Sequence, residues 1–291
     1  MKKTTLKYIA ASSCLSLMFG FKLNKENDFK NLAENHSECC ENFEIIAHRG
    51  FSSLELENSK EAILSAEENK CTDKIEIDIR LTKDNKIILA HDENNISNLD
   101  YKNIDIKPCL KSIEALLMWN DDDIMKELKV NRCSKMLVGT KTTLDEVLNI
   151  VNTSLIIDIK FENNEEAFIK EIFNVIRNKD NKIEFQSSNF EALKLMKSMN
   201  PNYKYFAIIS NKEQLLKTKN QFDGYTIKSN LISYNLVKEY LDNDKTIYVW
   251  TINSINSFER IKRILKEIDD DVSYITDYPD ALCGYQSKIK R

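Results

Sequence analysis

Short apolar runs rich in β-branched residues alternate along most of this chain with longer amphipathic stretches, and this alternation restricts the fold more than any other feature. The runs with strand character are residues 44–47, 75–81, 87–90, 155–159, 182–186, 203–209, 224–228, 245–251 and 273–276. Most are separated by segments such as "SKEAILSAEEN", "EEAFIKEIFNVIRNK" and "SFERIKRILKEI", which are long enough for a crossover helix. Repeated strand–helix units predict a parallel sheet, and about eight of them predict a closed (β/α)8 TIM barrel.

One connection is too short for a crossover. Only "TKDNK" separates the strand predicted to end at Leu81 from the one predicted to begin at Ile87. A parallel crossover needs about a dozen residues or more, so this pair is predicted to form an antiparallel β-hairpin. Its second strand would be extra to the barrel. It would also return His91 toward the region where the strand carrying Glu76 begins.

Residues 93–141 interrupt the regular pattern. They begin with a loop-like stretch, "ENNISNLDYKNIDIKPC", followed by helical spacing in "LKSIEALLMWN". We therefore expect an insertion over the barrel mouth, within one barrel domain that spans residues 43–291. The pattern resumes in "TTLDEVLNIVN", where Thr143 and Glu146 have the spacing of a helix capping box.

The N-terminus has the pattern of a targeting segment. Three lysines in the first seven residues precede an uncharged, mostly apolar stretch at residues 8–21, which is short for a membrane span. This predicts a signal or anchor segment at residues 1–21, followed by a polar tether at residues 22–42. An exported protein, extracellular or membrane-anchored through residues 8–21, is the expectation. An amphipathic or frayed terminus is the alternative.

Charge and cysteine content exclude some functions and leave others open. The formal net charge of -4 at pH 7 gives no electrostatic support for nucleic-acid binding. The seven cysteines lack the spacing of a metal site. Removal or lipidation of Cys14 would leave an even number, which suits disulfides outside the cell, but free thiols fit the sequence as well.

Paired carboxylates stand inside apolar runs where core side chains are expected. In "EIDIRLTKD", Glu76 and Asp78 lie two positions apart and therefore share one face of a strand. Carboxylates that close repel each other unless a cation or a proton lies between them. "SLIIDIKFE" places Asp158 and Lys160 in the same way. The carboxylates together suit a hard divalent cation, Ca²⁺ or Mg²⁺, whereas zinc fits poorly because no histidine or cysteine cluster has its ligand spacing.

Two of the three histidines follow strand-like runs. "IIAHRG" puts His48 and Arg49 at the carboxyl end of the first predicted strand, and His91 follows the run that begins at Ile87, while His36 falls in the tether. The carboxyl ends of the strands carry the active site in barrels of this kind. The two histidines, the arginine and the carboxylates therefore predict a catalytic site.

The order of these motifs carries a resemblance. "AHRG", "ENS", "EIDIRLTKD", "AHD", "IDIK", "VWTIN" and "ITDYP" follow one another along the chain. This series resembles that of the glycerophosphodiester phosphodiesterase family, over roughly residues 44–281. The resemblance implies a (β/α)8 barrel enzyme whose partner is a small-molecule substrate, a glycerophosphodiester such as glycerophosphocholine. The products would be glycerol 3-phosphate and an alcohol.

The resemblance also implies roles for individual residues. His48 and His91 correspond to the acid–base pair of the family, and Arg49 and Lys160 to its phosphate-binding residues. These roles fit the chemistry, because phosphodiester cleavage needs charge neutralisation on the phosphate, a base for the nucleophile and an acid for the leaving oxygen. Imidazoles titrate near neutrality and suit the last two tasks.

The metal ligands implied by the resemblance are Glu76, Asp78 and Asp158, with Ca²⁺ or Mg²⁺ as the ion. Asp158 stands where the family usually has glutamate, so the charge is kept on a shorter side chain. Trp250 corresponds to an aromatic residue near the glycerol pocket. Glu57 corresponds to an acid close to the metal and the site.

Other functions stay open at this point. A phospholipase-D-like relative would cyclise lysophospholipid or sphingomyelin, and a non-catalytic barrel would serve as a surface scaffold. A glycerol-phosphate polymer of the cell wall is a further substrate class. "QSSNF" at residues 186–190 departs from the usual family pattern, which leaves the substrate undetermined. Asp277 in "ITDYP" is expected to be structural, at the end of the last strand.

Overall fold

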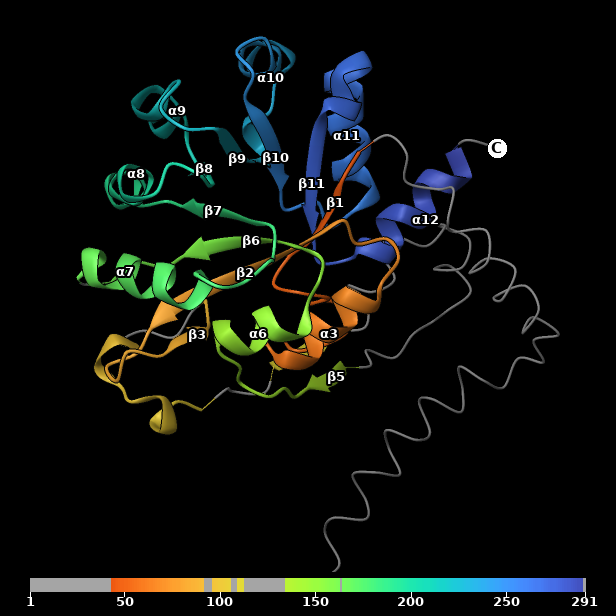
Figure 1. Cartoon of the computed structure of the whole chain (residues 1–291). Helices are drawn as coiled ribbons and strands as arrows, with labels where there is room; N and C mark the ends of the chain where they lie inside the picture. The colour runs from red at the N-terminus through yellow and green to blue at the C-terminus, as the bar shows by residue number, and fades with distance from the viewer. Residues whose placement is uncertain (1–42, 92–95, 106–108, 113–133, 163, 290–291) are drawn as a thin grey trace, which may run out of the picture.

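The computed structural model describes residues 43–91, 96–105, 109–112, 134–162 and 164–289 of the 291-residue chain (Figure 1). The predicted signal or anchor segment (1–21) and polar tether (22–42) lie outside these ranges. No helix within them is both long enough and apolar enough to cross a membrane. The described ranges cover most of the predicted barrel domain at residues 43–291.

Eight parallel strands close into a barrel, as the sequence predicts (Figure 1). They are β1 (Ile45–Ala47), β2 (Lys74–Leu81), β6 (Ser154–Ile159), β7 (Ile183–Ser187), β8 (Lys204–Ile209), β9 (Gly224–Lys228), β10 (Thr246–Trp250) and β11 (Val272–Thr276). From β2 the strands pair in the order β2, β6, β7, β8, β9, β10 and β11. β1 then pairs with both β11 and β2. The first strand thus closes the ring between the second and the last.

Helices cover the outside of the barrel (Figure 1). They are α3 (Lys60–Glu68), α6 (Leu144–Ile150), α7 (Glu165–Ile176), α8 (Phe190–Met199), α9 (Lys212–Thr218), α10 (Tyr234–Leu241), α11 (Ile255–Leu265) and α12 (Pro279–Ile289). Several begin at a polar side chain that accepts a backbone N–H of the first turn, such as Ser59 before α3 and Asn189 before α8. The predicted capping box of Thr143 and Glu146 is present at the start of α6.

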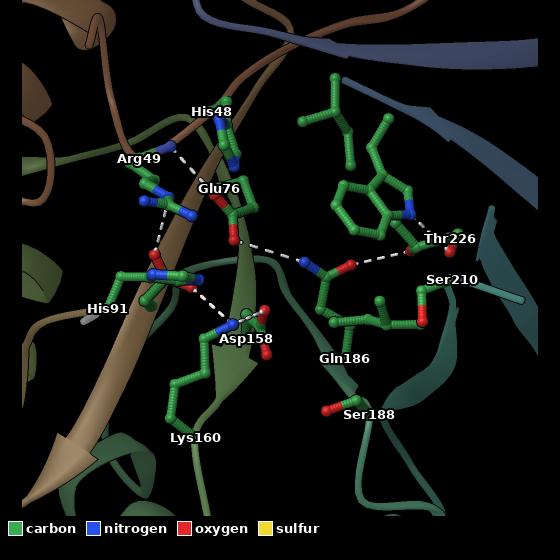
Figure 2. A pocket seen from close by; sticks show the side chains of 14 residues that line it. His48, Arg49, Glu76, His91, Asp158, Lys160, Gln186, Ser188, Ser210 and Thr226 are labelled. Atoms are coloured by element: carbon green, nitrogen blue, oxygen red, sulfur yellow. Dashed lines mark hydrogen bonds and ion pairs between the residues drawn. The ribbon is translucent and has the colours of Figure 1, made fainter. Parts of the chain in front are cut away.

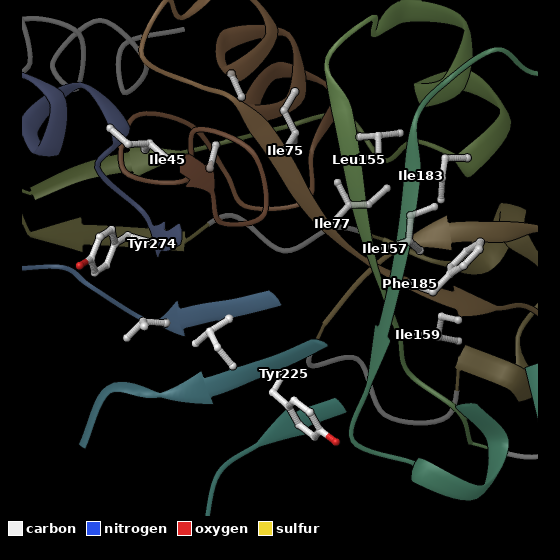
Figure 3. Packing of buried hydrophobic residues seen from close by; sticks show 14 of the residues in the cluster. Ile45, Ile75, Ile77, Leu155, Ile157, Ile159, Ile183, Phe185, Tyr225 and Tyr274 are labelled. Carbon is white, nitrogen blue, oxygen red and sulfur yellow. The ribbon is translucent and has the colours of Figure 1, made fainter. Parts of the chain in front are cut away.

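Alternation along the strands divides the core into two parts. On β2, Ile75, Ile77 and Ile79 are fully buried and belong to the large cluster between sheet and helices. Figure 3 shows Ile75 and Ile77 in this packing. Residues of the opposite face point into the barrel, where a smaller cluster contains Ile46, Ile156, Phe206, Tyr248 and Ile275. Burial of one isoleucine side chain contributes about 1.5–3 kcal/mol. The outer packing therefore offsets the cost of burying Glu76 and Asp78 on the inner face.

The predicted hairpin is also present. β3 (Ile87–Leu89) runs antiparallel to β2 and lies outside the ring of parallel strands. Its pairing with β2 covers only three residue pairs. Beyond them, the Ala90 N–H donates to the Asp78 carbonyl at 3.0 Å. Ala90 therefore lies level with Asp78, and His91 follows it, near the middle of β2 and short of the beginning of that strand.

Part of the 93–141 segment packs beside β3, where Ile96 and Ile104 share a buried cluster with Ile88 and Ala90. Two short 3-10 helices, η2 (Ile96–Asn98) and η3 (Tyr101–Asn103), are followed by a separate two-stranded sheet of β4 (Cys109–Ser112) and β5 (Ser134–Leu137). The Leu89 N–H donates to the Thr142 carbonyl at 3.1 Å. The Lys60 N–H, at the start of α3, donates to the Thr140 carbonyl at 3.0 Å. The predicted cover over the mouth concerns mainly residues 113–133, outside the described ranges.

A disulfide joins the beginning of the barrel to its end. Cys71 lies in the turn before β2 and Cys283 in α12, with 5.9 Å between their Cα atoms and a sequence separation of 212 residues. Both side chains are buried. The pairing, which the sequence leaves open, ties the first strand–helix unit to the last helix.

We expect the double substitution Cys71→Ser and Cys283→Ser to lower the free energy of unfolding by about 2–5 kcal/mol, because a bond across so long a loop restricts the unfolded chain. Chemical denaturation of the oxidised proteins, followed by tryptophan fluorescence, measures the difference. Addition of reductant should lower the midpoint of the wild type and leave that of the double variant unchanged. Equal midpoints for the two oxidised proteins would contradict the pairing.

Candidate active site

A cavity of about 230 Å³ opens at the carboxyl ends of the barrel strands (Figure 2). All of the sequence-predicted site residues line it except Glu57, which contacts the arginine of the cavity from outside. The residues that sequence analysis brought forward are His48, Arg49, Glu76, Asp78, His91, Asp158, Lys160 and Trp250. Gln186, Ser188, Ile208, Ser210, Thr226 and Ile275 complete the lining. The structure therefore gathers the scattered motifs into one place.

His48 is held by a carboxylate from the far end of the chain. Its Nδ1 lies 2.7 Å from Oδ1 of Asp277, which follows β11. Asp277 in turn accepts hydrogen bonds from the Ser52 hydroxyl at 3.0 Å and the Asn253 amide at 2.8 Å. With a proton on Nδ1 facing Asp277, the Nε2 atom of His48 is the ring nitrogen available for proton transfer. The expectation that Asp277 is only structural missed this contact.

The pKa of His48 reflects competing effects. Burial lowers it, but the hydrogen bond to Asp277 and the negative charges of Glu76 and Asp277 together outweigh burial. The net result is a pKa above the ordinary value for histidine. The protonated form of the imidazole is thus favoured more than in an ordinary histidine.

Arg49 bridges three acidic side chains. Its backbone N–H donates to Oε2 of Glu76 at 2.9 Å, and its Nε lies 3.1 Å from Oδ2 of Asp78. Its Nη1 donates to Glu57 at 2.6 Å. Burial lowers its pKa, but the negative charges of Asp78 and Glu57 raise the pKa by more. The guanidinium therefore stays charged. The residue has φ +57°, in the left-handed region, which costs of order 1–3 kcal/mol and which the surrounding contacts must hold in place.

The three carboxylates meet because of strand register. Asp78 of β2 is paired directly with Asp158 of β6, and Glu76 lies one step back on the same face of β2. One oxygen from each residue lies within 4.8 Å of the others. All three are buried, at 2%, 1% and 5% exposure for Glu76, Asp78 and Asp158. Lys160 lies among them, with Nζ 3.0 Å from Asp78 and 2.6 Å from Asp158.

Their protonation states differ. Burial, and then the charge of Asp78, raises the pKa of Glu76 to about 8. Burial also raises the pKa of Asp158 to about 6, despite the nearby ammonium of Lys160. For Asp78 the effect of burial is outweighed by the charges of Lys160 and Arg49, which lower its pKa. Asp78 is therefore the carboxylate of this group that stays ionised most readily.

The geometry fits a hard cation. Oδ1 of Asp158 is buried and has no hydrogen-bond partner among the described residues. A buried carboxylate oxygen without a partner is costly, and a bound ion would satisfy it. Across the ranges that the structure describes, Glu76, Asp78 and Asp158 form the one acidic group with ligand atoms close enough to hold a metal.

Asn58 orients the central carboxylate. Its side-chain amide donates to Oδ2 of Asp78 at 2.8 Å, and its Oδ1 accepts the backbone N–H of Asp78 at 3.0 Å. The residue has φ +56°, which asparagine tolerates better than most residues. Sequence reasoning quoted Asn58 within "ENS" but gave it no role. The "ENS" motif was the one sequence signal for this role. The contact itself depends on how the loop after β1 returns to β2, which the sequence does not show.

A chain of hydrogen bonds supports the opposite wall. Gln186 donates to Oε1 of Glu76 at 3.3 Å, and the Thr226 hydroxyl donates to the Gln186 side chain at 2.8 Å. The indole N–H of Trp250 donates to the Thr226 carbonyl at 3.1 Å. This hydrogen bond fixes the indole of Trp250, which lines the cavity. Ser188, from the "QSSNF" stretch, also lines this cavity.

The sequence model of the glycerophosphoryl diester phosphodiesterase family matches residues 48–281. The chain belongs to this family. The resemblance of its motif series is thereby confirmed, and its enzyme class is that of the family, the glycerophosphodiester phosphodiesterases.

Several similar proteins share less than 30% sequence identity with this chain. The uncharacterized protein MG293 of Mycoplasma genitalium is 27% identical over 240 residues, covering 74% of this chain and 89% of that protein. Among solved structures, a phosphodiesterase from Oleispira antarctica in complex with the product sn-glycerol-3-phosphate has a TM-score of 0.60 at 20% identity, over 85% of this chain and 97% of that one. The glycerophosphodiester phosphodiesterase of Thermotoga maritima has a TM-score of 0.58 at 22% identity, over 84% and 98%. At these identities the structures show a shared fold.

Proposed function

We propose that this member of the glycerophosphodiester phosphodiesterase family hydrolyses glycerophosphodiesters to glycerol 3-phosphate and an alcohol. His48 and His91 act as the acid–base pair, and Glu76, Asp78 and Asp158 hold a divalent cation, Ca²⁺ or Mg²⁺. One observation carries the proposal. The side chains of both histidines and the three carboxylates of the candidate metal site line the same cavity.

Two cationic side chains are placed to bind the phosphate. Arg49 and Lys160 both line the cavity, and each forms ion pairs with Asp78. A bound divalent cation would neutralise charge on the phosphate and polarise its oxygens. With Asp78 and Asp158 engaged by the ion, the donors of Arg49 and Lys160 would turn to the phosphate oxygens. Arginine binds phosphate through its planar fork and lysine as a point charge.

The imidazoles supply the proton transfers. Asp277 holds Nδ1 of His48 and leaves Nε2 for the reaction. His91 enters the cavity from the β2–β3 hairpin, on the side of Asp78. One ring accepts the proton of the attacking oxygen and the other donates a proton to the leaving oxygen, a division of labour that contributes roughly 10²- to 10⁴-fold each.

The remaining wall suits a glycerol moiety. The ring of Trp250, with Ile208 and Ile275, offers apolar surface for the carbon backbone. Ser188 and Ser210 add hydroxyl groups at the same cavity. A cavity of about 230 Å³ has room for a small polar group such as glycerol phosphate. The Oleispira antarctica structure, which holds sn-glycerol-3-phosphate in a shared fold, supports this substrate class.

Release of glycerol 3-phosphate from glycerophosphocholine tests the proposal. We expect release with Ca²⁺ or Mg²⁺, loss of release in EDTA, and recovery when the ion is added back. The same samples are followed by ³¹P NMR with lysophospholipid as substrate, since a cyclic phosphate there would point to the phospholipase-D-like alternative. A wild-type protein that does not cleave glycerophosphocholine with any divalent ion would refute the proposed hydrolysis of this substrate.

We further propose that the protein acts outside the cytoplasm, associated with the membrane through residues 8–21. The lysine-rich start followed by an apolar stretch supports export. The Cys71–Cys283 disulfide supports it independently, because such bonds persist mainly in oxidising compartments. Fractionation of cells that express the full chain decides the matter. Recovery of the protein in the cytosol alone would exclude both export and membrane association.

A further inference from the structure

Arg80 lies beside the cavity but does not line it. It follows Asp78 by two positions on β2 and therefore shares its face of the strand. Its guanidinium makes two hydrogen bonds to the backbone carbonyl of His91, one from Nε at 3.2 Å and one from Nη2. Its remaining nitrogen, Nη1, pairs with the carboxylate of Glu162. All three nitrogens of the fork are thus engaged.

Glu162 extends this contact to Ser97, on the other side of residues 92–95. It follows β6 and pairs with Arg80 through Oε1, while Oε2 accepts the backbone N–H of Ser97 at 3.4 Å. His91 and Ser97 stand on the two sides of residues 92–95, which lie outside the described ranges. One ion pair, joining β2 to the end of β6, therefore holds the chain on both sides of this stretch.

The position of the ion pair matters because His91 lies just beyond the end of the β2–β3 ladder. The β2–β3 pairing ends at Leu89, and the Ala90 N–H makes the next backbone bond, to Asp78. The Arg80 and Glu162 side chains are only 13% and 21% exposed, so water competes weakly for their bonds. A charged donor pair on one carbonyl is stronger than a neutral hydrogen bond.

We propose that Arg80 and Glu162 form a clamp that positions His91 at the mouth of the barrel. They are positioning residues, since neither lines the cavity where substrate would lie. The catalytic consequence depends on the proposed function, in which His91 transfers a proton. The structural consequence, a fixed backbone at His91, does not depend on it.

Kinetics test the catalytic consequence. We expect Arg80→Ala to lower kcat for glycerophosphocholine by roughly 10- to 100-fold with KM within about twofold, because a displaced imidazole weakens the chemical step more than binding. Arg80→Lys keeps the charge but cannot reproduce the planar fork, and should recover only a small part of the activity. Guanidinium chloride, and not sodium chloride, should partly restore Arg80→Ala. Glu162→Gln should lower kcat less, and the double variant should resemble Arg80→Ala, because both changes disable one unit.

Arg260→Ala is the matched control. This arginine also donates to a backbone carbonyl, that of Ser229 at 2.8 Å, but on a different loop of the barrel. Its loss should leave kcat within about twofold of the wild type. An Arg80→Ala enzyme with wild-type kcat, or one whose loss is matched by Arg260→Ala, would overturn the catalytic part of the proposal.

A measurement that does not depend on activity tests the clamp even if the protein does not hydrolyse glycerophosphocholine. The chain has three histidines, so NMR of the protein labelled at histidine ring carbons gives three signals that single substitutions assign. We expect Arg80→Ala to shift or broaden the His91 signal and leave that of His48 in place. An unchanged His91 signal in the folded variant would overturn the clamp. Absence of hydrolysis in the wild type, with the His91 signal still dependent on Arg80, would overturn the proposed function alone.

Discussion

Replacement of His48 by alanine is expected to lower kcat by roughly 10²- to 10⁴-fold, the usual contribution of a general acid or base. KM should change little, because the imidazole acts mainly in the transition state and the phosphate is bound by other groups. Steady-state release of glycerol 3-phosphate measures the loss. Circular dichroism of the variant checks that the barrel is intact.

Asp277→Asn extends the same prediction to the partner of His48. The amide has no negative charge, and its NH2 group can donate to Nδ1 where the carboxylate could only accept. The ring therefore loses its fixed tautomer and part of its basicity. In the Ser-His-Asp triad the corresponding change costs about 10⁴-fold, and we expect roughly 10²-fold or more here. Asp280→Asn is the matched control, since Asp280 is exposed at the start of α12. Full activity of Asp277→Asn would show that Asp277 only supports the strand end, as the sequence first suggested.

The metal-free protein is expected to lose stability as the pH rises from about 5 to 8. The pKa of Glu76 is raised by burial and by the charge of Asp78, from an ordinary value near 4.5 to about 8. The folded state therefore binds more protons than the unfolded state across this window, and stability falls with rising pH. His48, whose pKa is also raised, acts in the same direction above its ordinary value of 6.5. Thermal unfolding in EDTA at a series of pH values measures the effect.

Added Ca²⁺ or Mg²⁺ should reverse this loss. Above pH 8 the ion meets an ionised Glu76, whereas at pH 6 it must displace a proton, so its apparent affinity rises with pH. An ion present at a hundredfold its Kd stabilises the folded state by about 2.7 kcal/mol.

Glu76→Gln separates these effects. The variant should have a flatter pH profile in EDTA, a weaker response to the ion, and little activity. Glu191→Gln, an exposed change on α8, is the control. A wild-type midpoint that does not respond to either ion at pH 8 would argue against a metal site at Glu76, Asp78 and Asp158.

The barrel could be predicted because the signals for it are local. Strand-like runs and amphipathic stretches alternate along the chain, and the hairpin follows from the short "TKDNK" connection. Strand boundaries moved by only a residue or two, as for residues 245–251, observed as β10 (Thr246–Trp250). The bond between Cys71 and Cys283 could not be predicted, because their proximity depends on how the last helix returns to the first unit.

The candidate site was predictable where it follows from the alternation of strand side chains and from the position of residues at strand ends. Glu76 and Asp78 share a face because strand side chains alternate, and the carboxyl ends of barrel strands converge. Contacts across the barrel were not predictable. Asp277 reaches His48 over a separation of 229 residues, and this depends on register at the closure of the ring. Arg80 looks like an ordinary strand residue until the short hairpin brings the His91 carbonyl to it.

Closure of the ring has a consequence for when activity is acquired. β1 is fastened between β2 and β11, so the first strand of the domain can complete its pairing only after the last strand is made. His48 and Asp277 stand on the two sides of this seam, and the Cys71–Cys283 bond spans it outside the sheet. A chain that ends before β11 contains β2 and β6 but lacks Asp277, and therefore the histidine–aspartate pair. Under the proposed function, we therefore expect hydrolysis only after the barrel has closed.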